Sequence, residues 1–231
     1  MKNFYYAPKG DIDVKFEDVM TPCHSKTPSW WKDMGFYLKG AKSVLDLWTG
    51  LDQTKKQEVE AFTTVRACPG FRDLFRNSYL VKFPCDLLFE TKADGGYTWK
   101  TPSSENILGV YSHNSAQMVS PVSDKYLIIK FELPFFMSGK GIRLVYMDPI
   151  YYKDQPFKVC PGVVQLQSSN KGLGFNILTF FEKKDATYHF EQGDPLCLIY
   201  FPERVTVKEN PQMREFIKKK FVLEYGKNLN V

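Results

Sequence analysis

The stretch from Cys160 to Glu203 decides the fold, and it reads CPGVVQLQSSNKGLGFNILTFFEKKDATYHFEQGDPLCLIYFPE. It holds three runs rich in the β-branched and aromatic residues that favour strands. Polar segments with the composition of turns separate these runs. In the middle run both alternating faces carry apolar residues, which predicts a strand buried on both sides. The three predicted strands cover residues 159–166, 175–181 and 196–201.

Short strands separated by turn signals also precede this stretch. Asp94-Gly95-Gly96 predicts a tight hairpin. Pro84 predicts a bulge or an exposed edge in the strand that contains it. These additional strands are predicted at residues 11–16, 61–66, 79–90, 97–100, 125–136 and 142–146.

Two segments have the pattern of helices. Residues 68–77 predict a short internal helix, and a second helix is predicted to begin at Pro211 with Asn210 as its N-cap. The apolar stripe of this C-terminal helix includes Met213, Phe216 and Ile217. Because helical crossovers are absent, a parallel α/β fold is disfavoured. We therefore predict a mostly β protein, an antiparallel β-sandwich or barrel with a short internal helix and a C-terminal helix.

The length and charge fit one β domain with an added surface segment. The chain has 231 residues and a formal net charge of +5, which by itself says little about an anionic partner. We expect residues 1–60 to form an extended N-terminal arm and a surface insertion, and residues 61–231 to form the β domain. Neither a membrane-spanning segment nor a signal peptide is visible. The expected location is therefore a cytoplasm, with no membrane partner.

The spacing of cysteines and histidines does not indicate catalytic chemistry. The five cysteines are odd in number and lack close pairs, which argues against a disulfide framework. His24, His113 and His189 lie far apart and lack a metal-binding spacing. Cys68, at a predicted helix start, is the best candidate for a nucleophile, although a small buried apolar residue is the plainer interpretation. We predict no catalytic residue, no metal and no cofactor.

The Trp30-Trp31 pair is the most distinctive feature of the N-terminal arm. It follows Pro22 and Pro28, and these two prolines predict an extended segment rather than a helix. The favoured interpretation is that at least one ring packs on the core of the chain and anchors the arm. The functional alternatives are a stacking platform for a base or sugar, or a contact with a neighbouring subunit.

Residues 159–201 resemble the last β segments of the dUTPase-like, or β-clip, superfamily. The resemblance rests on Pro161-Gly162-Val163-Val164 and on Gly193-Asp194-Pro195-Leu196. It implies a β fold and a nucleotide site. Gln165 stands where the family has the Asp that orients water, and a lysine-rich segment replaces the family's glycine-rich phosphate loop. The resemblance therefore implies nucleotide binding without turnover.

The whole chain also resembles a group of uncharacterised proteins of tailed phages. The shared marks are Pro28-Ser29-Trp30-Trp31-Lys32 and Cys68-Pro69-Gly70-Phe71, followed by the two motifs above. This resemblance implies a viral source and a β fold, and it implies no activity.

The function expected from these features is that of a non-catalytic phage protein. It would assemble as a homo-oligomer or dock on other virion proteins, in the host cytoplasm and in the virion. The alternatives are a dUTPase-like protein that binds or hydrolyses a nucleotide, and a carbohydrate-binding module that binds a glycan. Tyr151 and Tyr152 are expected on an exposed crossing between strands. The candidate binding residues are Trp30, Trp31, Gln165, Asn176, Tyr151 and Tyr152.

Overall fold

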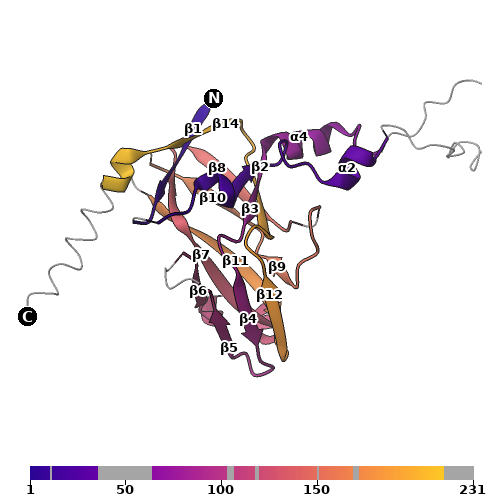
Figure 1. Cartoon of the computed structure of the whole chain (residues 1–231), viewed down its shortest axis with the longest axis vertical. Helices are drawn as coiled ribbons and strands as arrows, with labels where there is room; N and C mark the ends of the chain where they lie inside the picture. The colour runs from indigo at the N-terminus through magenta and orange to yellow at the C-terminus, as the bar shows by residue number, and fades with distance from the viewer. Residues whose placement is uncertain are drawn as a thin grey trace, which may run out of the picture.

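The structure, a computed structural model, consists mainly of antiparallel strands with a few short helices (Figure 1). It describes residues 1–10, 12–35, 64–102, 107–117, 120–149, 151–168 and 172–215. These residues form a six-stranded, a five-stranded and a three-stranded sheet. The prediction of a mostly β, sandwich-like fold is confirmed.

The six-stranded sheet has the order β14-β1-β7-β11-β9, and β6 also pairs with β7. Its strands are β1 (Lys2–Pro8), β6 (Gly109–Ser112), β7 (Tyr126–Ser138), β9 (Phe157–Val159), β11 (Leu173–Glu182) and β14 (Val205–Glu209). β1 and β14 run parallel, whereas the other pairs are antiparallel. β7 is long enough to pair with β1 near one end and with β6 near the middle.

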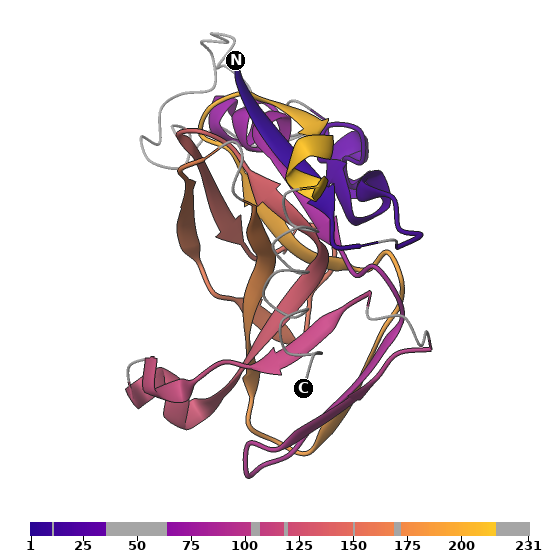
Figure 2. The same ribbon diagram turned by 90° about the vertical axis from the view of Figure 1, so that its left-hand side faces the viewer.

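The five-stranded sheet has the order β10-β8-β13-β3-β2. Its strands are β2 (Met20–Pro22), β3 (Ser78–Lys82), β8 (Ile142–Met147), β10 (Gly162–Leu166) and β13 (Pro195–Tyr200). The three-stranded sheet, β12-β4-β5, consists of β4 (Leu87–Thr91), β5 (Tyr97–Lys100) and β12 (Ala186–Phe190). Figure 2 shows this small sheet at the end of the molecule away from the N-terminus.

The helical elements are short. They are α1 (Phe16–Val19), α2 (Ser29–Asp33), α4 (Pro69–Asn77), α5 (Ser120–Lys125) and the 3-10 turn η1 (Ser115–Gln117). The predicted internal helix at 68–77 is thus confirmed as α4. None of the helices in the described ranges is long and apolar enough to cross a membrane.

The main core is rich in phenylalanine and lies between the sheets. On β11, Phe175, Ile177 and Phe181 are fully buried, together with Thr179. Thr179 satisfies its hydroxyl by donating a hydrogen bond to the carbonyl oxygen of Ile129 at 3.1 Å. The opposite face of β11 is only half-buried, so the prediction of a strand fully buried on both sides is wrong.

Two long chain segments cross from the five-stranded sheet into the three-stranded sheet at one corner. Phe83 and the turn at Gly193-Asp194 exchange backbone hydrogen bonds of 2.9 Å there. Gly193 has a φ of +92°, a conformation that favours glycine. The predicted strand 79–90 is therefore two strands, β3 and β4, and Pro84 lies between them. Pro84 is buried and does not mark an exposed edge.

The predicted hairpin at Asp94-Gly95-Gly96 is confirmed between β4 and β5. The Gly95 N–H donates to the Lys92 carbonyl oxygen at 3.0 Å, and Gly95 has a φ of +89°. Gly139 and Gly141 lie between β7, in the six-stranded sheet, and β8, in the five-stranded sheet, so the chain passes from one sheet to the other there. The strands predicted at 125–136, 142–146, 159–166 and 196–201 are present as β7, β8, β9 with β10, and β13.

Two strand predictions near the N-terminus are wrong. The strand lies at Lys2–Pro8 rather than at 11–16, where residues 12–15 are irregular and Phe16 begins α1. The buried positions of β1, Phe4 and Ala7, are three residues apart and so do not show the two-residue period of a half-buried strand. In the predicted strand 61–66, the described part is a turn. The predicted domain boundary between residues 60 and 61 lies outside the described residues.

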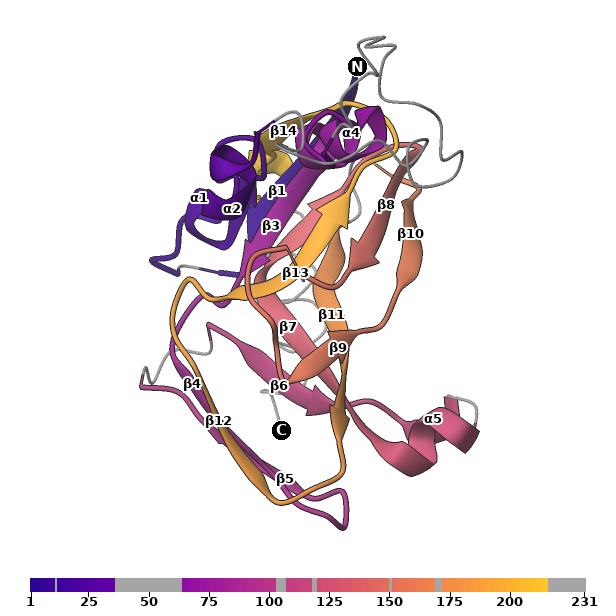
Figure 3. The same cartoon turned by 90° about the vertical axis from the view of Figure 1, so that its right-hand side faces the viewer.

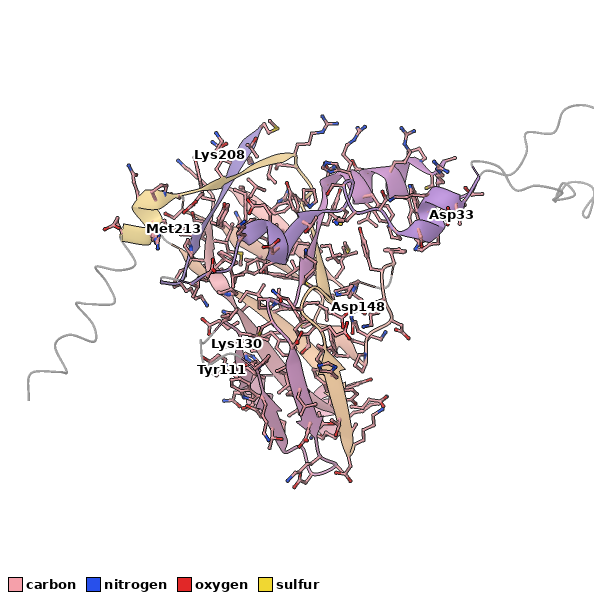
Figure 4. All side chains as sticks on the ribbon, in the orientation of Figure 1. Asp33, Tyr111, Lys130, Asp148, Lys208 and Met213 are labelled. Atoms are coloured by element: carbon pink, nitrogen blue, oxygen red, sulfur yellow. The ribbon has the colours of Figure 1, made fainter. Side chains whose placement is uncertain are left out.

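The C-terminal helix begins where the sequence predicts. The Met213 N–H donates to Asn210 Oδ1 at 3.1 Å, so Asn210 is the N-cap, and residues 211–215 are helical. Met213 is buried, and Figure 4 shows it beside the end of β14. Phe216, Ile217 and the lysines at 218–220 lie outside the described residues.

Candidate functional site

Six aromatic side chains from three distant segments form a cluster at one end of the five-stranded sheet. Trp30 and Trp31 lie on α2, Phe71 and Phe75 on α4, and Tyr151 and Tyr152 on the connection after β8. The Trp31 ring centre lies 4.8 Å from that of Phe75, and the Phe71 ring centre lies 5.5 Å from that of Tyr151. These rings cover a small second core of Cys23, Phe75, Leu80 and Leu198.

This cluster brings together four of the six predicted binding residues. Trp30, Trp31, Tyr151 and Tyr152 are all half-buried in it. The prediction that at least one tryptophan packs on the chain's own core is confirmed. The prediction that Tyr151 and Tyr152 lie on an exposed crossing is wrong, because the connection folds back onto α4.

The tryptophans lie on a helical turn rather than on an extended arm. Pro28 is the N-cap of α2 and so precedes the helix instead of interrupting it. The Trp30 Nε1–H donates to the Tyr151 carbonyl oxygen at 2.8 Å. Arg66 Nη1 donates to the carbonyl oxygens of Lys32 at 2.9 Å and of Met34 at 2.6 Å, which satisfies the end of the helix.

An open groove of about 730 Å³ borders this aromatic cluster. α4 forms one side, and the segment from Phe201 to Val205, which leads into β14, forms the other. Figure 3 shows α4 and β14 at the same end of the molecule, close to the N-terminus. The residues that give the groove its character are Trp31, Arg72, Arg76, Tyr79, Glu203 and Arg204.

The three arginines of the groove are exposed. Arg72 and Arg76 are four residues apart on α4, so their side chains lie on one face of the helix. Arg204 approaches from the opposite side. None of the ion pairs between described residues includes any of the three. The groove therefore holds three positive charges close to aromatic rings.

Glu203 is the one acid among the described lining residues, and it already has partners. Its Oε2 lies 2.6 Å from Lys2 Nζ, and its Oε1 lies 4.0 Å from Arg143 Nη2. The hydrogen bond from Lys2 lowers the pKa of Glu203 below its ordinary value of 4.5. The carboxylate is thus charged and engaged on the side of Lys2.

The helix that presents the arginines is fixed to the five-stranded sheet by a polar network. Asp73 accepts a hydrogen bond from Asn77 Nδ2 at 2.8 Å and another from the Tyr200 hydroxyl at 2.9 Å. The Phe201 N–H donates to the Asn77 carbonyl oxygen at 3.0 Å. Because these bonds join α4 to β13, the groove has two walls at a fixed separation.

The other two predicted binding residues lie elsewhere and apart from each other. Gln165 is exposed on β10, the edge strand of the five-stranded sheet, opposite Arg143. Asn176 lies on β11 in the six-stranded sheet, where its Oδ1 is buried without a hydrogen-bond partner among the described residues. Near it, Lys9 forms an ion pair with Glu132, and Lys130 Nζ lies 5.0 Å above the Tyr111 ring (Figure 4).

The histidines and cysteines do not converge. His24 lies at the groove, His189 is on β12, and no three metal-ligating side chains in the described segments could hold one ion. Cys68 is exposed at the start of α4, and no hydrogen bond within the described ranges joins it to a histidine. Burial raises the pKa of the Cys23 thiol from 9.0 to about 11, so Cys23 is an uncharged core residue at neutral pH.

Comparisons with protein-family models, with curated proteins and with solved structures found no match for this chain.

Proposed function

We propose that this chain is a non-catalytic interaction protein that binds a polyanionic partner through the groove between α4 and β14. One observation carries the proposal. Arg72, Arg76 and Arg204 converge on one open groove, and none has an acidic partner within the described part of the chain.

Such an arrangement costs the folded protein stability. Two like charges four residues apart on a helix destabilise it by roughly 0.2–0.5 kcal/mol. Some other surface cations are paired, as with Lys153, whose Nζ lies 2.8 Å from Asp194 Oδ2. A polyanion would offset the repulsion, because guanidinium groups bind phosphate and carboxylate through paired hydrogen bonds.

Binding explains the groove better than catalysis does. Catalysis of hydrolysis needs a base or a metal that is held against the substrate by further contacts. The groove offers arginines, aromatic rings and a carboxylate that Lys2 already engages. The one histidine among its described lining residues, His24, forms no ion pair with a described carboxylate. These groups attract and orient an anion.

The test uses long-chain inorganic polyphosphate, which carries charge and nothing else. Arg72→Glu with Arg76→Glu should weaken polyphosphate binding at least about tenfold in a fluorescence or calorimetric titration, since each charge-assisted hydrogen bond contributes about 1.5–3 kcal/mol. The matched control is Lys92→Glu with Lys100→Glu. Lys92 directly follows β4 and Lys100 ends β5. Both are exposed, neither lines the groove, and the change in net charge is the same. Equal weakening in both variants would show that binding follows net charge and would contradict the proposal.

Self-association is a second candidate, and the edge strand β10 favours it. β10 ends the five-stranded sheet, and Val163 on it is 66% exposed. An unpaired strand edge with an apolar side chain is a template for pairing with a second copy. Sedimentation of the wild type and of Val163→Lys tests this: a dimer that dissociates on substitution supports the candidate, and a wild-type monomer excludes it.

A further inference from the structure

We infer that the polyanion is a single-stranded nucleic acid, with its phosphates along Arg72, Arg76 and Arg204 and a base stacked on Trp31. This inference rests on the proposed function and adds a ligand class to it. Two properties of the groove carry it: aromatic rings in its lining, and three arginines from two separate segments of the chain.

Trp31 is a rigid platform at the end of the groove. Its ring lies 4.8 Å from the Phe75 ring and is stacked at 6.2 Å on the Phe71 ring, measured between centres. These contacts hold the indole on one side while it lines the groove on the other. A ring already immobilised by the protein loses little entropy on stacking with a base.

Tyr79 provides a second ring in the same groove. It is half-buried on β3, and its ring lies edge-on to Phe201 with centres 5.6 Å apart. It lines the groove together with Trp31. Aromatic rings within a positively charged groove are the combination that single-stranded nucleic acids recognise, because every base has a flat face.

Three arginines from two segments of the chain line the groove, and together they can contact a chain of phosphates. Residues four apart on a helix have Cβ atoms about 5–6 Å apart, and Arg204 adds a third charge across the groove. A pocket for one phosphate group would place its donors around a single point. The three arginines lie on two segments and are exposed, so they can contact successive phosphates of a longer ligand.

Other polyanions use only part of this surface. An acidic peptide can satisfy the arginines but offers no base to Trp31. A duplex offers phosphates but keeps the faces of its bases within the stack. A single strand is the polyanion that presents both, so the rings and the arginines together favour it.

The experiment measures fluorescence anisotropy of a labelled 20-mer of oligothymidylate with the full chain. Competitors are polyphosphate, a duplex of equal charge, polyglutamate and thymidine monophosphate. The single strand should compete best, and thymidine monophosphate should compete poorly because it engages few of the arginines. Equal competition by polyglutamate would point to an acidic protein partner, and tight binding of the mononucleotide would point to a nucleotide site. Either result overturns the inference.

Variants of Trp31 separate stacking from charge. Trp31→Leu keeps an apolar side chain on Phe75 and should lower affinity for oligothymidylate by roughly 5- to 100-fold. Its affinity for polyphosphate should not change. Trp31→Phe keeps a ring, so it should restore most of the affinity for oligothymidylate. The bound strand should quench the protein's own tryptophan fluorescence less in this variant than in the wild type. Melting temperatures confirm that each variant is folded.

The inference and the proposed function fail in different ways. If Trp31→Leu binds both ligands as the wild type does, the groove binds polyanions without stacking, and only the inference is lost. If neither oligothymidylate nor polyphosphate binds the wild type, both are lost.

Discussion

Two neighbouring sets of cations at the same end of the molecule differ in what they contact. Lys2 and Arg143 face Glu203, so their charges are partly neutralised across β1, β8 and the segment before β14. Arg72, Arg76 and Arg204 border the groove between α4 and β14, and no described carboxylate pairs with them. The first set joins elements of the fold, whereas the second leaves its charge available to a ligand.

The largest expected effect comes from removing the second set. Arg72→Ala, Arg76→Ala and Arg204→Ala together should lower affinity for oligothymidylate by about 100-fold or more, because several charge-assisted hydrogen bonds are lost at once. The free energy of unfolding should stay the same or rise, since repulsion between the arginines is relieved. Anisotropy and chemical denaturation measure the two quantities. A marked loss of stability would show that these arginines serve the fold.

The buried cluster beneath the groove should respond to alkaline pH. The folded-state pKa of Cys23, about 11, lies above its ordinary value of 9.0 because the thiol is buried. Its contribution to stability is therefore complete below pH 9 and is lost as the pH rises towards 11. Between these values the wild type should lose about 2 kcal/mol more than Cys23→Ala in urea denaturation. If the free energy of unfolding falls with pH by the same amount in the wild type and in Cys23→Ala, this account is contradicted.

A smaller effect is expected from removing Lys2 and Arg143, the two cations that are paired with Glu203. Lys2→Ala with Arg143→Ala removes two exposed partners of Glu203, and surface ion pairs contribute at most about 1 kcal/mol. The melting temperature should fall slightly, and affinity for oligothymidylate should fall less than threefold. A loss as large as that of the triple arginine variant would remove the distinction between the two sets.

Glu203→Gln should raise the affinity for oligothymidylate, whereas the arginine substitutions lower it. It removes the one acid among the described lining residues of the groove. Affinity for oligothymidylate should rise about two- to threefold at low salt, because one unfavourable charge is removed. Raising the salt concentration should erase the gain. Weaker binding by this variant would place Glu203 in contact with the ligand as an acceptor.

The smallest expected effect is the absence of turnover with a nucleotide. Gln165 cannot accept a proton as an Asp could, and it is exposed on an edge strand beside Arg143. Incubation with dUTP and magnesium should release no pyrophosphate above a buffer control. Turnover that disappears in Gln165→Ala would overturn the non-catalytic proposal.

Local sequence patterns were sufficient for most of the strands. The β4–β5 hairpin follows from Asp94-Gly95-Gly96, α4 from its apolar face, and the Asn210 cap from its side chain. These features depend on residues that are close in the sequence. β1 was missed because its buried positions, Phe4 and Ala7, are three residues apart and give no two-residue alternation.

The candidate site depends on contacts between distant segments. The sequence indicates four of its residues by their aromatic rings: Trp30, Trp31, Tyr151 and Tyr152. Only the fold shows that the four rings lie in one cluster. Arg72 and Arg76 are four residues apart on a predicted helix, and this spacing is the sequence signal that could have identified them. Arg204 lies more than 100 residues away, and only the pairing of β13 with β3 brings its segment beside α4.

Photocrosslinking tests the central claim most directly. Oligothymidylate carrying 5-iodouracil is irradiated with the full chain, and the attached peptides are identified by mass spectrometry. The account predicts that the crosslink forms at Trp31 or Tyr79 and disappears with Arg72→Glu and Arg76→Glu, but not with Lys92→Glu and Lys100→Glu. Crosslinks confined to the three-stranded sheet, or unchanged by the arginine substitutions, would contradict it.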